Sequence, residues 1–133
     1  MKDRVLIDTS AWIAYFQGSA PQSCTARIDD LLARSDIFVP KIVIAELIQG
    51  AHSETELGVI REFLQAFRVV GEREKTWIEA GRLSFGLRKK GKTVNLADCY
   101  IAVIAVENSC AVFTLDAHFR EIEKAGAVRL VPV

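Results

Sequence analysis

Four carboxylic acids stand in or directly beside strongly apolar segments, although they are far apart in the sequence: Asp8, Glu46, Asp98 and Asp116. If folding brings them to one place, their mutual repulsion either raises their pKa values or requires a cation. The set offers only oxygen ligands, which suit Mg²⁺ or Mn²⁺ better than zinc. Magnesium held by a few carboxylates, with several waters still bound, is typical of phosphate chemistry. The four acids therefore indicate a candidate site for metal-dependent phosphate chemistry.

Each of these acids also has an ordinary structural interpretation. Asp8 and Asp116 follow apolar runs and precede helical segments, where aspartate often caps a helix N-terminus. Asp98 lies in the first turn of a helical segment after Asn95, where a carboxylate suits the helix dipole and could join a capping box. Glu46 could lie on the one solvent-facing stripe of its helix. The apolar neighbours of Asp98 nevertheless predict burial, and a buried ionised group needs a partner.

The elements that would position the acids follow from the hydrophobic pattern, in which short β-branched runs alternate with longer segments of helical periodicity. The predicted strands are Arg4–Asp8, Ile37–Val39, Phe67–Val70, Ala111–Thr114 and Arg129–Val131. The predicted helices are Ala11–Gln17, Cys24–Arg34, Lys41–Ala51, Glu54–Ala66, Glu72–Lys89, Leu96–Asn108 and Ala117–Ala125. Strands that alternate with helices need crossover connections, which predict a three-layer α/β/α domain around a parallel sheet of four to five strands. Ligands bind outside the carboxyl ends of such strands, so Asp8 and Asp116 should share one edge of the sheet.

Length and composition limit the class of protein. A chain of 133 residues fits one domain, here residues 1–133, with a hydrophobic core of its own. Seventeen basic residues balance seventeen acidic ones, so no global field attracts a polyanion. The absence of a membrane-length apolar run and of a signal-peptide pattern predicts a cytoplasmic protein without a membrane partner. Cys24, Cys99 and Cys110 lack metal-ligand spacing and are interpreted as reduced thiols, and His52 and His118 as surface or helix-end residues.

Four short segments carry these acids in order, namely "VLIDTSAWI", "IAELIQG", "LADCYIAVIA" and "FTLDAHF". Together they resemble the four acidic blocks of a PIN domain. Length and block order are similar to those of the VapC-type ribonuclease toxins of toxin–antitoxin systems, over about residues 4–131. The resemblance implies a PIN-like fold and an endoribonuclease that hydrolyses RNA phosphodiester bonds with Mg²⁺ or Mn²⁺.

The resemblance also implies roles for individual residues. Asp8 and Asp98 would be the main metal ligands, and Glu46 and Asp116 would complete the catalytic pocket. The family often carries Ser or Thr beside its first acid and two residues before its last, and the matching residues here are Thr9, Ser10 and Thr114.

RNA must also be held near a pocket that is itself negative. The basic run "LRKKGK" precedes the block of Asp98 and supplies Arg88, Lys89, Lys90 and Lys92. These cations could guide the phosphodiester backbone, or they could simply form a solvated helix end favoured by the dipole. The apolar residues of the helices between 41 and 66 could receive an antitoxin helix or a second copy of the chain. The resemblance implies both a VapB-type antitoxin and a homodimer.

Two other classes of protein remain compatible with these residues. A magnesium-dependent phosphatase or phospho-acceptor domain also combines a parallel sheet with clustered acids. The haloacid-dehalogenase type expects a second aspartate two residues after the first, where this chain has Ser10, and a receiver-like domain expects early paired acids where this chain has Leu6 and Ile7. A non-catalytic α/β binding module, with the acids as helix caps, predicts neither metal binding nor RNA cleavage.

Overall fold

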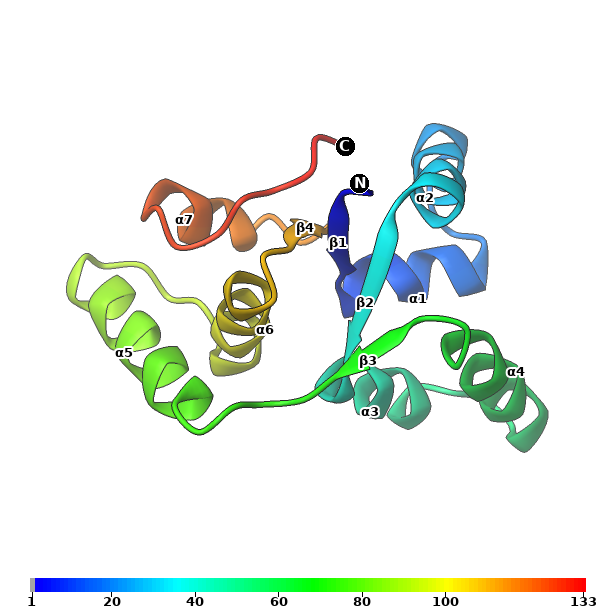
Figure 1. The fold of residues 1–133 in the computed structure, drawn as a ribbon, viewed down its shortest axis with the longest axis horizontal. Helices are drawn as coiled ribbons and strands as arrows, with labels where there is room; N and C mark the ends of the chain where they lie inside the picture. Colours follow the sequence, from blue (N-terminus) through cyan, green and yellow to red (C-terminus); the bar gives the residue numbers. More distant parts are fainter. Residues whose placement is uncertain (1) are drawn as a thin grey trace.

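A computed structural model describes residues 2–133, and its elements alternate along the chain (Figure 1). The strands are β1 (Arg4–Ile7), β2 (Asp36–Pro40), β3 (Arg68–Val70) and β4 (Ala111–Phe113). The helices are α1 (Thr9–Gln17), α2 (Gln22–Arg34), α3 (Lys41–Gln49), α4 (Glu54–Leu64), α5 (Thr76–Lys89), α6 (Leu96–Glu107) and α7 (Phe119–Lys124).

The four strands form one parallel sheet with the order β3-β2-β1-β4. Val5 of β1 stands opposite Ile37 of β2 on one side and Ala111 of β4 on the other. The chain thus builds outward from β1 through β2 to β3 and then returns to place β4 on the opposite side of β1. Strand order therefore reverses beside β1, and this is where an open α/β sheet binds its ligands.

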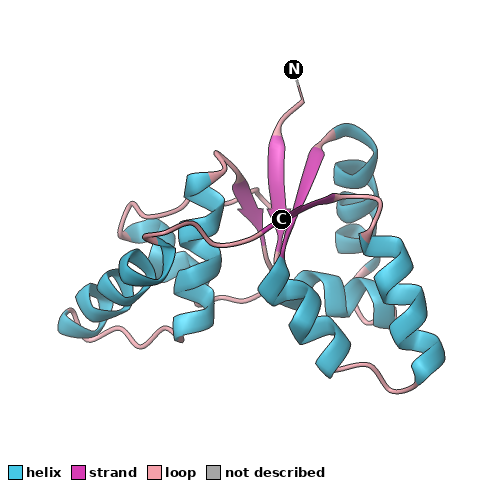
Figure 2. Ribbon diagram, turned by 60° about the horizontal axis from the view of Figure 1, so that its bottom comes forward, coloured by secondary structure: helices cyan, strands magenta, loops and turns pink. Residues whose placement is uncertain are grey.

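The predicted three-layer α/β/α architecture is confirmed. Helices α5, α6 and α7 lie on one side of the strands, and α2, α3 and α4 lie on the other (Figures 1 and 2). Helix α6 is buried along most of its length, as its all-round apolar sequence predicts, and it packs against α5 and β4. No helix within residues 2–133 has both the length and the apolar character needed to cross a membrane.

Most predicted elements end within two residues of the observed ones, and two differ by more. The segment Arg129–Val131 pairs with β4 only through the parallel bridge between Val112 and Leu130. Pairing cannot extend further because β4 ends at Phe113 and the chain turns away. Helix α5 begins at Thr76 rather than at the predicted Glu72. The residues before it form a turn, held by the Tyr100 hydroxyl, which donates to Glu72 (2.8 Å), and by the Arg73 N–H, which donates to the Thr76 hydroxyl (2.8 Å).

Candidate metal centre

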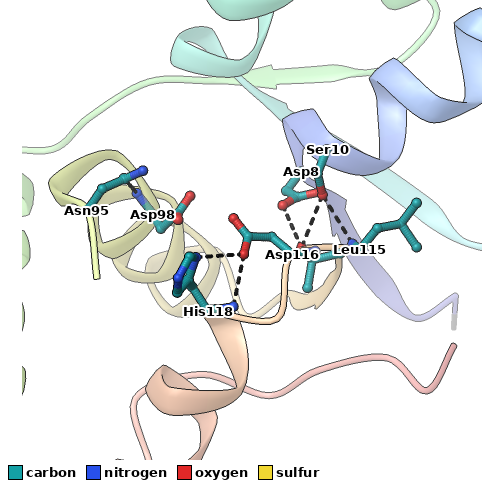
Figure 3. Close-up of polar contacts among 8 residues, drawn as sticks. Asp8, Ser10, Asn95, Asp98, Leu115, Asp116 and His118 are labelled. Atoms are coloured by element: carbon teal, nitrogen blue, oxygen red, sulfur yellow. Dashed lines mark hydrogen bonds and ion pairs between the residues drawn. The ribbon is translucent and has the colours of Figure 1, made fainter. Parts of the chain in front are cut away.

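Three of the four predicted acids lie just after a strand or on the helix that follows it, and Asp98 lies at the start of α6, which follows α5. Asp8 comes directly after β1 and is the N-cap of α1. Asp116 lies in the loop between β4 and α7, Asp98 is in the first turn of α6, and Glu46 is on α3, the helix after β2. Figure 3 shows the carboxylate of Asp116 between those of Asp8 and Asp98.

Asp8 is nearly fully buried, with 3% of its surface exposed. Its carboxylate accepts hydrogen bonds from the start of α1 and from the residue that follows β4. One carboxylate oxygen accepts from the Ser10 hydroxyl (2.7 Å) and the Ala11 N–H (3.0 Å). The other accepts from the Thr114 hydroxyl (2.6 Å). Burial raises the pKa of Asp8, although these hydrogen bonds oppose the rise. Asp8 therefore does cap α1, and its cap interpretation and its place in the acidic cluster hold together.

Three hydroxyl groups connect the elements of the cluster. Thr9 donates to Glu46 Oε1 (2.7 Å) and so joins α1 to α3. Ser10 accepts from the Leu115 N–H (3.1 Å), and Thr114 accepts from the Asp116 N–H (2.9 Å). These contacts fix the loop that carries Asp116 against the start of α1.

Asp98 differs from Asp8 because its carboxylate is buried without being satisfied. Only 9% of the residue is exposed, and Oδ2 has no hydrogen-bond partner among the residues that the structure describes. Asn95 caps α6 through the Asp98 N–H (2.9 Å), so the Asp98 side chain is not needed as a cap. Burial, followed by the negative charges of Asp116, Asp8 and Glu46, raises the pKa of Asp98 to about 6.

His118 joins this cluster, although the sequence interpretation treated it as a surface or helix-end residue. It is indeed exposed and stands at the N-terminus of α7. Its Nδ1 lies 3.0 Å from Asp116 Oδ1, and its N–H also donates to that oxygen (2.9 Å). Ligand atoms of Asp98, Asp116 and His118 all lie within 4.8 Å of one another. The sequence signal for His118 was its position two residues after Asp116 in "LDAHF". At this spacing a tight turn brings the two side chains to the same side of the chain.

The basic residues proposed for RNA surround the end of α5. Arg88 and Lys89 are in its last turn, and Lys90 is its C-cap. Lys92 Nζ lies 3.5 Å from a Glu121 carboxylate oxygen, and Lys89 Nζ lies 5.2 Å from the centre of the Phe85 ring. The helix-end interpretation therefore holds for their position, whereas RNA binding by these cations stays a prediction.

The comparisons with known proteins agree with this architecture. The model of the PIN domain family matches residues 5–125. Ribonuclease VapC1 of Methanocaldococcus jannaschii is 25% identical over 126 residues, covering 94% of this chain and 85% of the relative. Ribonuclease VapC5 of Mycobacterium tuberculosis is 23% identical over 134 residues, covering 96% and 94%.

Solved structures give the same result. DNA-bound VapBC from Salmonella typhimurium aligns with a TM-score of 0.77 and 26% identity, over 97% of each chain. Mycobacterium tuberculosis VapC20, described as a sarcin-ricin loop cleaving toxin, aligns with a TM-score of 0.70 and 17% identity, over 96% of this chain and 99% of that one. Because the family model matches most of this chain, the chain belongs to the PIN domain family.

Proposed function

We propose that this protein is a Mg²⁺- or Mn²⁺-dependent endoribonuclease of the VapC type, and that residues 1–133 form a single PIN-like domain. One observation carries the proposal. The Asp98 Oδ2 atom is buried without a partner beside three further carboxylates. Such a group is costly unless a cation neutralises it. The names of the curated relatives, which are ribonucleases, support the reaction class.

The donor set fits a hard divalent cation. The resemblance implies Asp8 and Asp98 as the main ligands. We propose Asp98 and Asp116 for this role, because their carboxylate oxygens lie within 4.8 Å of each other and of a His118 nitrogen, whereas Asp8 already accepts three hydrogen bonds. Asp8 and Glu46 would complete the acidic pocket. When bound, the cation would lower the pKa of a water and neutralise charge that builds on the scissile phosphate. No covalent enzyme intermediate is needed for this hydrolysis.

The remaining work belongs to residues that orient the acids and hold the substrate. Thr114 and Ser10 fix Asp8, and Thr9 fixes Glu46, so these carboxylates are positioned before RNA arrives. In this proposal the basic end of α5, from Arg88 to Lys92, attracts the phosphodiester backbone toward the acids.

We further propose a VapB-type antitoxin and a second copy of this chain as partners. The solved structures that the chain resembles include VapBC complexes, and some of these are bound to DNA. On this chain, a cavity of about 110 Å³ between α1, α3 and α4 has an apolar part formed by Ile13, Phe16, Leu47 and Ile60 and a polar rim that includes Gln17, His52 and Glu56. A cavity of this size and character suits an apolar side chain on a partner's helix.

The test is incubation with structured RNAs, with Mg²⁺, with Mn²⁺ and with a chelator. We expect internal cleavage with metal and none with chelator. Asp98→Asn should reduce the cleavage rate at least about a hundredfold, because it removes charge from the metal pocket without changing the backbone cap on Asn95. Asp30→Asn, on α2 beside the start of β1, is the matched control and should cleave like wild type.

Three results would contradict the proposal. Full cleavage by the Asp98 variant would exclude this site. Cleavage that persists in chelator would exclude the metal dependence. A chain that neither cleaves RNA nor binds Mn²⁺ would be the non-catalytic module, with the acids serving as caps.

A further inference from the structure

A cavity of about 220 Å³ opens directly beside Asp116. The loop after β4, the beginning of α7 and the C-terminal segment form its walls. Its lining includes Thr114, Leu115, Asp116, Arg120, Leu130 and Val131. The cavity therefore continues from the acidic pocket toward the edge of the sheet where Leu130 pairs with β4.

Arg120 is the cation that lines this cavity, and its charge is not used within the fold. Its side chain makes no hydrogen bond or ion pair with the residues that the structure describes, and it is exposed. Asp116 lies in the loop just before the helix that carries Arg120, and it lines the same cavity. The Asp116 carboxylate contacts His118, and the Arg120 guanidinium remains available to a ligand.

The other walls of the cavity are largely apolar, and this limits the class of ligand that the cavity can bind. Leu115 is 37% exposed although it is apolar, and its side chain points away from Asp98 (Figure 3). The bond from its N–H to Ser10 fixes its position. Leu130 and Val131 are partly buried against the core. One guanidinium and an apolar wall suit a ligand with one phosphate and one flat apolar part. The volume is below the range of about 300–1,000 Å³ found for pockets of drug-sized ligands, which favours a single nucleotide unit.

We propose that this cavity is a nucleotide subsite for RNA. Arg120 binds the phosphodiester group next to the scissile one, and Leu115, Leu130 and Val131 contact the ribose and base. The inference rests on the proposed ribonuclease activity and adds the place where the strand enters or leaves the acids. Arg120 is a positioning residue in this scheme, because it neutralises an adjacent phosphate and does not join the metal centre.

The test compares Arg120→Gln, Arg120→Lys and Arg82→Gln. Arg82 is an exposed arginine on α5 that lines a separate groove with Glu79 and Glu107, so it controls for the loss of one positive charge. With a short single-stranded RNA, Arg120→Gln should raise KM about tenfold, the usual effect of losing one charge-assisted contact, while kcat changes less than about twofold. Arg120→Lys should recover most of the loss, and Arg82→Gln should behave like wild type.

Two measurements separate this subsite from the metal centre. In chelator, where no cleavage occurs, fluorescence anisotropy should show weaker RNA binding by Arg120→Gln and a salt slope smaller by about 0.7. Mn²⁺ affinity, measured by calorimetry without RNA, should not change. Circular dichroism checks that each variant is folded.

Several outcomes would overturn the inference. They are an unchanged KM, a lower kcat at constant KM, or equal losses in the Arg120 and Arg82 glutamine variants, while wild type still cleaves RNA. Those results would leave the proposed function intact. Absence of cleavage by wild type would instead refute the proposed function, and the anisotropy measurement would still decide whether Arg120 contacts RNA.

Discussion

The two edges of the sheet carry charge in opposite ways. At the amino-terminal edge, a cavity of about 810 Å³ is lined by several basic residues and two acids. The cavity carries more positive than negative charge, and Asp30 pairs with two of its arginines. Asp30 lies 3.3 Å from Arg27 and 2.7 Å from Arg34, and Arg4 donates to the Asn108 carbonyl (3.1 Å). At the carboxyl edge the cavity beside Asp116 is smaller. The negative charge of Asp116 lies close to that of Asp98, and the two carboxylates repel each other.

Burial explains why this difference matters. The side chains of the Arg27–Asp30 and Arg34–Asp30 pairs are 37–79% exposed, so water screens them and they add little to stability. Asp8 and Asp98 are buried beside each other's charge, where water cannot compensate. The larger cavity is therefore the less informative one. Unbalanced charge in a buried place, rather than cavity size, marks the site.

Thr114→Val should give the largest loss of stability, because it removes the hydroxyl that bonds both Asp8 and the Asp116 N–H. One buried carboxylate oxygen and one partly buried N–H lose a partner, which costs about 2–3 kcal/mol. Thermal unfolding should therefore shift down by roughly 10 °C, and cleavage should fall with it. Ser35→Ala is the control at the amino-terminal edge, and its melting temperature should stay close to that of wild type. Equal shifts in the two variants would mean that the Thr114 hydrogen bonds at the carboxyl edge contribute no more to stability than Ser35 does at the amino-terminal edge.

Asp98→Asn should raise the stability of the protein when metal is absent. The folded pKa of about 6 lies above the ordinary value of 3.8, so the folded chain binds this proton more tightly than the unfolded chain does. The contribution of Asp98 to stability therefore falls as pH rises from about 4 to 6, and the ionised group destabilises the fold at pH 7.5. The variant should be more stable by about 1–2 kcal/mol at pH 7.5, and the difference should shrink near pH 4.

With metal bound, wild type should become more stable than Asp98→Asn. Mn²⁺ stabilises a folded state that binds it, so wild type should melt several degrees higher with metal, whereas Asp98→Asn should respond weakly. Differential scanning calorimetry with Mn²⁺ and with chelator measures both effects. An Asp98 variant that is less stable at pH 7.5 and still responds fully to Mn²⁺ would place the unbalanced charge elsewhere.

The sequence predicted most of the fold because the patterns were local. The apolar run of α6 and the short β-branched runs of β1 and β2 each specify an element without reference to the rest of the chain. The start of α5 was placed too early because the hydroxyl of Tyr100, 28 residues away in the sequence, holds Glu72 in the turn before the helix. The last predicted strand forms only a bridge because its partner strand is short.

The acidic cluster was predicted only as a possibility, for a related reason. Each acid taken alone could be a cap, and Asp8 is one. The distinction between a cap and a ligand depends on whether every oxygen is satisfied, which for Asp98 only the assembled neighbourhood decides. The spacing in "LDAHF" brings His118 near Asp116, but it does not specify whether the Asp116 carboxylate contacts His118 or Arg120.

The smallest effect should come from Asp30→Asn at the amino-terminal edge. Arg27 and Arg34 lose an ionic partner that is 44% exposed, so the free energy of unfolding should change by less than about 0.5 kcal/mol. The double variant Asp30→Asn/Asp98→Asn then tests whether the edges are independent. Their separate effects, measured by denaturant unfolding in chelator, should add within about 0.5 kcal/mol, because residues without shared partners do not couple. A coupling of 1 kcal/mol or more would mean that the surplus positive charge at one edge supports the buried acids at the other, and the two edges would have to be treated as one electrostatic system.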